Sequence, residues 1–555
     1  MKIDFFQHGS CRESAPDNQS TTCGAEPVVD DRCLAHLTPT AKDAYLAALS
    51  PGADIHAQGV TFAGETLRDL LDTLTDDRGR VQVGTADFGR ATFTGNADFR
   101  RVIFDGDVDF RRVTFNKGVD FHGATFGGAA DFANAIFTGE ADRPITQCVD
   151  FYGATFAEDA DFSHATFIEE ADFGRATFSG ACELYGGTFT KKAVFYRATF
   201  AGIAVFYHVT FAEGGNFYGA TFAEPASFER AAFNGWASFG SAVVRDELRM
   251  EAVAKRFEAD GMRGAGRMTL RLRAAEVDLT NMVLAGPVAV HGLQRPIPDV
   301  DESAFANDQG VVPPVQVISL RGVDAEAMTL TDVDLSECLF AGLSCADRLV
   351  LDGRCVFADD PRGRRKVLAD EHHWRAKRAA QSSDRRGGGT RWWSPPPERD
   401  LGKIEIVEPA RLEVLYRQLR KALEDSKNEP GAADFYYGEM EMRRAGARRG
   451  EQLLLWLYWL VSGYGLRAGR AITVLLTMVA LLALGMKCAG FPGEPVPYLD
   501  ALLYSLRATI AVDVKSTTVP ENVNRWGQIF QILLRIVGPL LVALAAMAIR
   551  NRVKR

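Results

Sequence analysis

A large apolar residue recurs through the first half of the chain at alternating steps of five and six residues. Between Phe88 and Val244 there are 28 such positions, and 26 of them are Phe; the exceptions are Leu184 and Val244. A small or β-branched residue stands two positions before each, and the residue between them is usually polar, commonly Asp or Thr. This alternation predicts short strands whose first and third side chains share a face. The apolar positions do not follow the i+3, i+4, i+7 pattern, which excludes an amphipathic helix.

The pattern resembles the pentapeptide-repeat proteins, in which every fifth residue is large and apolar and the residue two before it is small. The resemblance implies a mainly β fold, a right-handed quadrilateral β-helix in which each Phe points to the axis. The alternating six-residue step departs from the family and implies one extra corner residue per two faces. The eight extra residues between Phe137 and Phe151, around Glu140 to Gln147, are expected to bulge from a corner. The predicted core includes Phe88, Phe93, Phe99, Phe110, Phe162, Phe173, Phe195, Phe206 and Phe217.

The flanking segments predict how the β-helix begins and how far it extends. Short helices at Thr40 to Leu49 and Thr66 to Leu74 would cap its N-terminal end, where strand edges are otherwise unpaired. A five-residue rhythm continues irregularly to about residue 360, interrupted by a polar, Pro-containing insertion at 291–314. It is carried by Val277, Leu279, Met282, Leu284, Leu320, Leu330, Leu335, Phe340 and Cys345.

The sequence therefore divides into an N-terminal region (1–80), a regular β-helix (81–245) and its irregular continuation (246–360). A linker (361–407), a helix (408–450) and a membrane domain (451–555) follow. The linker is predicted to be partly disordered, because Gly, Pro and charged residues dominate it without periodicity. Two spans, 471–491 and 529–549, are long and apolar enough to cross a bilayer. An aromatic-rich helix at 452–462 suits the membrane interface, and 498–512 predicts a re-entrant or amphipathic helix.

Basic residues flank both predicted spans on the same side. Arg443, Arg444, Arg448, Arg449, Arg467 and Arg470 precede the first span, and Arg550, Arg552, Lys554 and Arg555 follow the second. By the positive-inside rule, the β-helix and the C-terminus are cytoplasmic and the protein is a multi-pass protein of the plasma membrane. ADEHHWR (369–375), SGYGLRAGRA and GPLLVALAAMAIRNRVKR resemble a bacterial group of pentapeptide-repeat membrane proteins, which implies this architecture but no reaction.

The layout of span, short helix and span also resembles the two-helix pore module of potassium-type channels. A potassium filter has a sequence similar to Thr-Val-Gly-Tyr-Gly. The corresponding residues here are Ala511, Val512, Asp513, Val514 and Lys515. Without the two glycines, this segment does not predict a potassium filter. Gly463-Tyr464-Gly465 precedes the first span and does not lie between the two.

Polar residues within the membrane domain are candidate functional residues, since charge is costly in a bilayer. They are Arg507, Asp513 and Arg535. We expect Arg535 either to face the interior of the hairpin and pair with Asp513 or a helix C-terminus, or to snorkel to the headgroups.

Net charge and cysteine content limit which binding and catalytic functions the sequence can support. The net charge is -9, and the repeat from Gly84 to Arg245 holds 20 acids against 13 bases, which disfavours nucleic-acid binding. Cys11, Cys23, Cys33 and His36 could together bind zinc, but their spacing matches no familiar paired motif. The nine Cys are therefore interpreted as reduced thiols, and no metal or cofactor is predicted. The adjacent Glu371, His372 and His373 are interpreted as structural or surface residues. No nucleophile–base pair is legible, so no catalytic residues are predicted.

Three classes of function remain. The leading prediction is a membrane-tethered scaffold that binds an unknown protein partner through the β-helix and contacts the lipid bilayer. The alternatives are a degenerate pore or transport subunit and a DNA mimic that binds a topoisomerase. The oligomeric state is left open.

Overall fold

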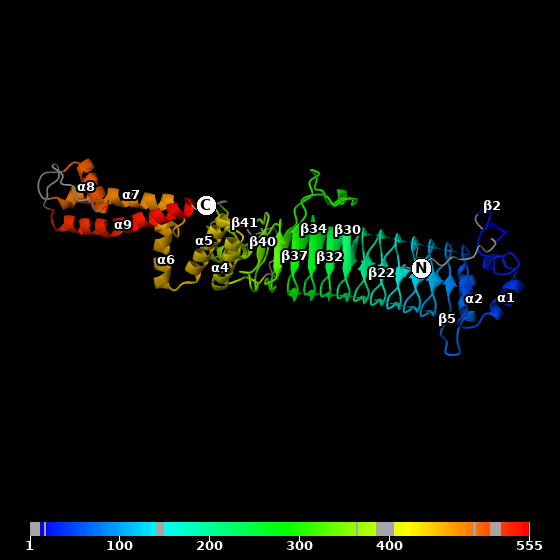
Figure 1. Cartoon of the computed structure of the whole chain (residues 1–555). Coiled ribbons are helices and arrows are strands. Elements are labelled where there is room, and N and C mark those ends of the chain that lie inside the picture. Colours follow the sequence, from blue (N-terminus) through cyan, green and yellow to red (C-terminus); the bar gives the residue numbers. More distant parts are fainter. Residues whose placement is uncertain are drawn as a thin grey trace. The chain divides into compact units, whose positions relative to one another are not determined.

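The computed structural model describes residues 11–15, 18–139, 149–361, 365–383, 405–491, 496–510 and 523–553. They form two compact units, Met1–Ala358 and Asp359–Arg555, which are taken in turn. The first unit is a parallel β-solenoid and the second is helical (Figure 1). The predicted mainly β fold followed by helices is therefore confirmed. The bulge expected at Glu140 to Gln147 lies outside the described residues.

The solenoid has four faces, and each face is a column of short parallel strands. Strands one coil apart pair in register, as Ala86 does with Val108 and Val108 with Ala130. The column that starts at Ile55 continues through twelve pairings to Val350, which gives twelve turns. Coils are 22 residues long because each holds two five-residue and two six-residue steps, for example from Ala160 to Cys182.

The strands of the regular coils are two or three residues long. The first face holds β3, β6, β10, β14, β18, β22 and β26, at Ile55–His56, Ala86–Asp87, Val108–Asp109, Ala130–Asp131, Ala160–Asp161, Cys182–Glu183 and Ala204–Val205. The second holds β4, β7, β11, β15, β19, β23 and β27, at Thr61–Phe62, Thr92–Phe93, Thr114–Phe115, Ile136–Phe137, Thr166–Phe167, Thr188–Phe189 and Thr210–Phe211. The third holds β8, β12, β16, β20, β24 and β28, at Ala97–Asp98, Val119–Asp120, Val149–Asp150, Ala171–Asp172, Ala193–Val194 and Gly214–Asn216. The fourth holds β5, β9, β13, β17, β21, β25, β29, β31, β33 and β36, at Gln82–Val83, Ile103–Phe104, Thr125–Phe126, Thr155–Phe156, Thr177–Phe178, Thr199–Phe200, Thr221–Phe222, Val243–Val244, Arg263–Gly264 and Val283–Leu284.

Stacked phenylalanine rings fill the interior. Phe162 is fully buried and its ring stacks on that of Phe132 one coil earlier, with centroids 4.8 Å apart and planes 2° apart. Phe173 lies half a coil away and meets Phe162 edge-on at 5.4 Å and 87°. Most rings thus combine stacking along a column with edge-to-face contacts across the axis, the two geometries that aromatic quadrupoles favour.

Beyond Ala226 the strands lengthen and the coil shortens. β30 (Ala226–Ser238) pairs with β26, β27 and β28, so it runs continuously along three faces. From Leu248 the coil is 20 residues long, since Leu248 pairs with Met268 and Met268 with Val288. The coil loses its extra corner residues here, but the spacing varies further along the chain, where Thr329 pairs with Val350 and Asp334 with Val356. The strands are β32 (Leu248–Glu258), β34 (Met268–Arg273), β35 (Glu276–Asp278), β37 (Val288–Gly292), β38 (Gln316–Ser319), β39 (Met328–Thr331) and β40 (Val350–Asp352).

Two predicted core residues of this part differ from expectation. Cys345 stands at a corner with a positive φ of 50° and is only half-buried, because the apolar position of that coil is taken by Leu343 and Ala346. Leu284 is also half-buried. Leu320, Leu330, Leu335 and Phe340 are buried.

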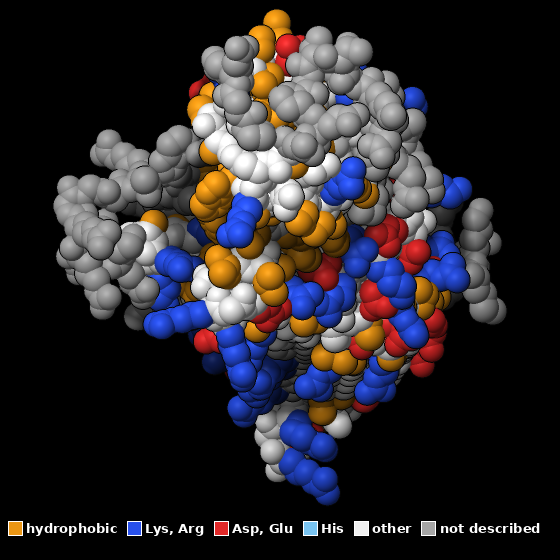
Figure 2. Space-filling model, turned by 90° about the vertical axis from the view of Figure 1, so that its left-hand side faces the viewer, with side chains coloured by type: hydrophobic (Ala, Val, Ile, Leu, Met, Phe, Trp, Pro, Cys, Tyr) orange, Lys and Arg blue, Asp and Glu red, His pale blue; other side chains and the backbone are white. Residues whose placement is uncertain are grey.

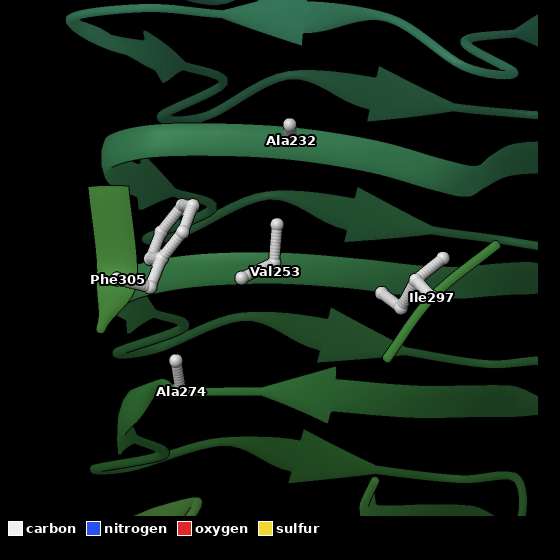
Figure 3. Close-up of a cluster of buried hydrophobic side chains, with 5 residues drawn as sticks. All are labelled: Ala232, Val253, Ala274, Ile297 and Phe305. Atoms are coloured by element: carbon white, nitrogen blue, oxygen red, sulfur yellow. The ribbon is translucent and has the colours of Figure 1, made fainter. Parts of the chain in front are cut away.

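The insertion between β37 and β38 packs on the side of the solenoid rather than extending freely. Ile297, and Phe305 in η2 (Ser303–Phe305), lie against Ala232, Val253 and Ala274 of successive coils (Figure 3). Arg273 and Glu302 form an ion pair of 2.5 Å beside this cluster, and each side chain is about a tenth exposed. A segment that its composition marks as a polar loop is thus held by an apolar contact.

Helices and a hairpin occupy the N-terminal end of the solenoid (Figure 1). α2 (Gly64–Thr73) replaces the strand of the third face in the first coil and buries Leu67, Leu70 and Leu71, so it covers the outer edge of β8. α1 (Pro39–Ala48) packs on α2, and β1 (Ser14–Ala15) pairs with β2 (Asn18–Thr22) ahead of the short helix η1 (Leu34–His36).

The second unit contains helices α3 to α9. α3 (Ala369–Ser383) lies in the segment predicted as linker, after β41 (Ala358–Asp359) and β42 (Lys366–Val367). The single helix expected at 408–450 is two helices, α4 (Pro409–Asp425) and α5 (Glu429–Gly446). The chain turns between them because Lys427 has a positive φ of 60° and Asn428 caps α5 through the N–H of Gly431. The remaining helices are α6 (Arg449–Ser462), α7 (Ala468–Gly485) with the π-turn η4 (Met486–Gly490), α8 (Tyr498–Ile510) and α9 (Arg525–Val553).

Candidate functional site

The side chains of the predicted core phenylalanines all lie inside the solenoid and form none of its binding surface. All nine named above are buried, with exposures of 0 or 1%. They fix the spacing of the coils and leave the outward-facing positions to determine what the solenoid can bind.

Aspartates on two opposite faces form the corners of the solenoid. Eight of them accept a hydrogen bond through Oδ1 from the backbone N–H two residues further on, at 2.6–3.1 Å. The next residue then takes a positive φ of 54–67°, as Arg90 and His164 do. Each aspartate therefore stabilises a turn that its non-glycine neighbours would disfavour. These residues are Asp87, Asp98, Asp109, Asp120, Asp131, Asp150, Asp161 and Asp172.

The register stacks these carboxylates in columns, which perturbs their ionisation. Burial raises the pKa of Asp131 to about 6, and the charges of Asp161 and Asp109 above and below add to this. On the opposite face, hydrogen bonding and charge from Arg100 hold the pKa of Asp98 below its usual value. Two carboxylates in equivalent corners thus have opposite shifts.

Asp131→Asn is expected to stabilise the solenoid at pH 8 but not at pH 3.5. The raised pKa means that charging Asp131 costs more in the folded state, so the penalty grows as pH rises from 3.8 towards 6 and is complete above it. The amide still accepts from the N–H of Ala133, as Asn216 does from Tyr218. Allowing for solvent screening, we expect a gain of about 1 kcal/mol, measured by thermal unfolding at both pH values.

Asp98→Asn is the matched control, because it occupies the same kind of corner with a lowered pKa. It should destabilise at pH 8, where wild-type Asp98 is charged and paired with Arg100 at 2.6 Å. Equal shifts of the same sign in both variants would show that the columns do not determine the ionisation of these residues.

Tyrosines stand at the corners of the later coils, where earlier coils carry residues such as Arg111 and Ser163. Tyr185 stacks on Tyr207 one coil later at 5.5 Å, and Tyr196 stacks on Tyr218 at 6.1 Å on the opposite face. We call these four residues the tyrosine columns. Arg230 lies over the ring of Tyr207 and Arg197 over that of Tyr196. These residues are not among the predicted site residues, although their 22-residue spacing, one coil, is visible in the sequence.

Exposed tyrosines beside arginines are typical of protein-binding surfaces, where they supply most of the binding energy. Tyr185 is 43% exposed, Tyr218 38%, and the neighbouring Ile203 52%. Large apolar groups accessible on a rigid scaffold need little reorganisation to bind a partner.

A buried ionic network organises the start of the helical unit. Glu371 of α3 is fully buried and its carboxylate meets Arg365 at 2.5 Å, Arg375 at 2.6 Å and the hydroxyl of Tyr416, which donates at 2.5 Å. Burial alone would raise the pKa of Glu371, but the two arginines and Tyr416 hold it at about 2. These contacts give Glu371 a structural role, as the sequence predicts.

The Gly463-Tyr464-Gly465 triplet also belongs to this unit's framework. Gly463 ends α6 in the left-handed conformation, and the buried Tyr464 donates a hydrogen bond of 3.0 Å to Glu441 of α5. The triplet resembles part of a filter sequence, but here its first glycine serves to end helix α6.

Three apolar helices, α7, α8 and α9, pack together after this turn. Val479, Ala508 and Leu534 form their common core, and Gly538 lies so close to Thr509 that a Cβ would approach its methyl to 2.6 Å. Two stretches, Gly469–Gly490 and Arg525–Leu544, are long and apolar enough to cross a membrane. Large side chains stay exposed on them, among them Leu476 at 60% and Ile536 at 67%.

Arg535 does not face the interior of this bundle. It is exposed, because Leu534, Gly538 and Leu541 at i, i+4 and i+7 form the packing stripe of α9 and Arg535 falls beside it. The hypothesis that Arg535 faces the interior of the hairpin is therefore wrong with respect to the part of the hairpin that the structure describes. Asp513, its expected partner, lies outside them, and Arg507 is half-buried on α8.

A groove beside α6 combines arginine with tryptophan. It has a volume of about 680 Å³ and is lined by Arg375, Arg444, Arg449, Trp456 and Trp459, among others. Arg444 and Arg470 lie over the ring of Trp459, at 5.1 and 4.9 Å. Figure 2 shows a face of the molecule on which Lys and Arg side chains lie near hydrophobic ones. This combination is typical of the interface between water and lipid.

Among the described residues, two groups could hold a metal by distance alone. Cys11, Cys23, Cys33 and His36 bring their ligand atoms within 4.8 Å of one another, and so do Asp324, Glu326 and Cys345. The second group is exposed or half-exposed, and its carboxylates need no ion in that environment. In the first group, Cys11 and Cys33 are fully buried.

Comparison with protein families matches the solenoid. The model described as "Pentapeptide repeats (9 copies)" matches residues 99–142, 145–188 and 195–243. These segments are pentapeptide repeats. No curated protein and no solved structure shows significant similarity to the chain. The pentapeptide repeats thus account for the regular coils, and the coils on either side extend the same solenoid.

Proposed function

We propose that this chain is a membrane-tethered, non-catalytic pentapeptide-repeat scaffold that binds a protein partner through one tyrosine column, Tyr185 and Tyr207. The observation that carries the tether is the exposure of apolar side chains along α7 and α9, with Leu476, Leu481, Ile536 and Leu540 each at least 60% exposed. A soluble surface rarely carries so large an apolar patch, whereas hydrocarbon would cover it at no cost.

The groove beside α6 supports the same arrangement. Its arginines suit the phosphates of anionic lipids and its tryptophans the headgroup region. α6 itself exposes Leu453, Leu454, Trp456, Leu457 and Leu460. An interfacial α6 followed by two spans would keep both the solenoid and the C-terminus on the cytoplasmic side, since the flanking residues are arginines.

Membrane extraction tests the tether. The full chain expressed in bacteria should stay in the membrane pellet after alkaline carbonate washing, and a variant that ends at Gly446 should be released. In a Cys488→Ser background, an impermeant thiol reagent should label Thr518→Cys in intact cells but not Asp308→Cys in the insertion. Release of the full chain would contradict the tether, and labelling at Asp308→Cys would contradict the orientation.

Photocrosslinking tests the partner surface. A crosslinker placed at Ile203, just before the first-face strand that leads to Tyr207, should capture a discrete protein, and Tyr185→Ala with Tyr207→Ala should abolish that product. A crosslinker at Thr177, on a face without tyrosines, is the control. Products that are equal at both positions would show that this tyrosine column binds no specific partner.

A further inference from the structure

The N-terminal hairpin and the helix after it bring four potential metal ligands together. Cys11 stands before β1 and Cys23 after β2. The N–H of Cys11 donates to Ala25 O at 2.8 Å and the N–H of Gly24 donates to Cys11 O at 3.3 Å, which holds Cys11 beside Cys23. Cys33 precedes η1 and His36 ends it, so the one turn of this helix presents both on one side. Two residues from each element thus form one cluster.

The distances within the cluster are those of a tetrahedral zinc site. Sγ of Cys23 and Sγ of Cys33 are 3.8 Å apart, and Nδ1 of His36 lies 3.5 Å from Sγ of Cys11 and 3.3 Å from Sγ of Cys33. Around zinc, bonds of about 2.3 Å to sulfur and about 2.0–2.1 Å to nitrogen place sulfurs about 3.8 Å apart and sulfur and nitrogen about 3.5 Å apart. A disulfide would need a sulfur–sulfur distance of about 2.05 Å.

We propose that Cys11, Cys23, Cys33 and His36 bind one structural Zn²⁺ as a closed Cys₃His site. Four protein ligands leave no open position, which is typical of structural rather than catalytic zinc. The irregular spacing, with 11, 9 and 2 residues between ligands, conceals the site in the sequence, because the hairpin and not a short motif brings Cys11 and Cys23 together.

The zinc site would fasten the N-terminal cap to the first coil of the solenoid. Ala25, two residues after Cys23, is buried against Gly59, where an added Cβ would lie 3.3 Å from the Cα of Ala25. The N–H of Glu26 donates to Gln58 O at 2.8 Å. A metal-held knuckle therefore covers the end of the first coil, where strand edges would otherwise be open to pairing with other chains.

Metal analysis of the full-length protein in detergent tests the proposal. Protein purified under reducing conditions with zinc supplied should contain about one zinc per chain. Cys33→Ser and Cys23→Ser should lower this content at least about tenfold. Cys488→Ser, an exposed cysteine outside the cluster, should leave it unchanged. Equal zinc content in all variants, or none in the wild type, would overturn the assignment.

Cobalt substitution keeps the test independent of whether the variants fold. Wild-type protein loaded with Co²⁺ should show the visible bands of tetrahedral cobalt and a near-ultraviolet sulfur-to-metal band, and His36→Ala should alter the visible bands. Mass spectrometry after alkylation distinguishes the alternative: a Cys23–Cys33 disulfide in reductant-free protein that binds no metal would refute the site. With zinc bound, exchange of the amides of residues 23–36 should slow, and unchanged exchange would show that metal does not hold the cap.

Discussion

Replacing Phe162 with alanine is expected to lower the free energy of unfolding of the solenoid by about 3–5 kcal/mol. The ring stacks on Phe132 and meets Phe151 and Phe173 edge-on, at 5.6 and 5.4 Å. The cavity left behind should not collapse, because backbone ladders fix the coil spacing: the N–H of Phe162 donates to Glu183 O at 2.7 Å and the N–H of Asn134 to Ser163 O at 2.8 Å. The loss should therefore approach the upper part of this range.

Thr166→Ser is the matched control for this prediction. Thr166 belongs to the next strand of the same coil, but its side chain points outward and is half-buried, so we expect a change below about 0.5 kcal/mol. Unfolding of both variants is followed by circular dichroism of the β-sheet signal. Melting temperatures that are equal within error would contradict the proposed interior of stacked rings.

The interior of the solenoid could be predicted because it is local and periodic. A coil repeats every 22 residues, so the position of Phe162 follows from that of Phe173 without knowledge of distant contacts. The tyrosine columns and the aspartate corners share this period, and their spacing could have revealed them as well. The shift to 20-residue coils after Leu248 was harder to detect, because Leu, Met, Val and Ala replace Phe there and weaken the pattern.

Contacts between residues far apart in sequence were not predictable in this way. Arg365, Glu371 and Tyr416 meet in one network although they belong to a loop and two different helices. The Cys₃His cluster depends on a hairpin whose two strands carry no periodic signal. The packing face of α9, which excludes Arg535, depends on which side chains of α7 and α8 it meets. Local periodicity determines none of these contacts.

Glu371→Gln is expected to destabilise the helical unit by about 3–5 kcal/mol, because removing the carboxylate leaves Arg365 buried without a counter-charge. Arg365 is 6% exposed and Glu371 is fully buried, so water cannot solvate the remaining charge. Tyr416→Phe removes only one hydrogen bond to the same carboxylate and should cost about 1–2 kcal/mol. Loss of Tyr416's hydroxyl also leaves the N–H of Leu368 without its 2.9 Å acceptor. Thermal unfolding of the detergent-solubilised chain, followed by the circular dichroism of its helices, measures both.

The pH dependence separates the ionic role of Glu371 from simple packing. Its pKa is lowered from 4.5 to about 2 in the folded state, so its stabilisation is complete above pH 4.5 and is lost as pH falls towards 2. Wild-type protein should therefore lose stability across this window, and Glu371→Gln should lose less. Glu413→Gln, which removes a half-buried partner of the exposed Arg417 on α4, is the control and should change stability by less than about 0.5 kcal/mol. Equal pH slopes in wild type and Glu371→Gln would show that Glu371 acts through its shape alone, since only the ionised carboxylate can compensate Arg365 and Arg375.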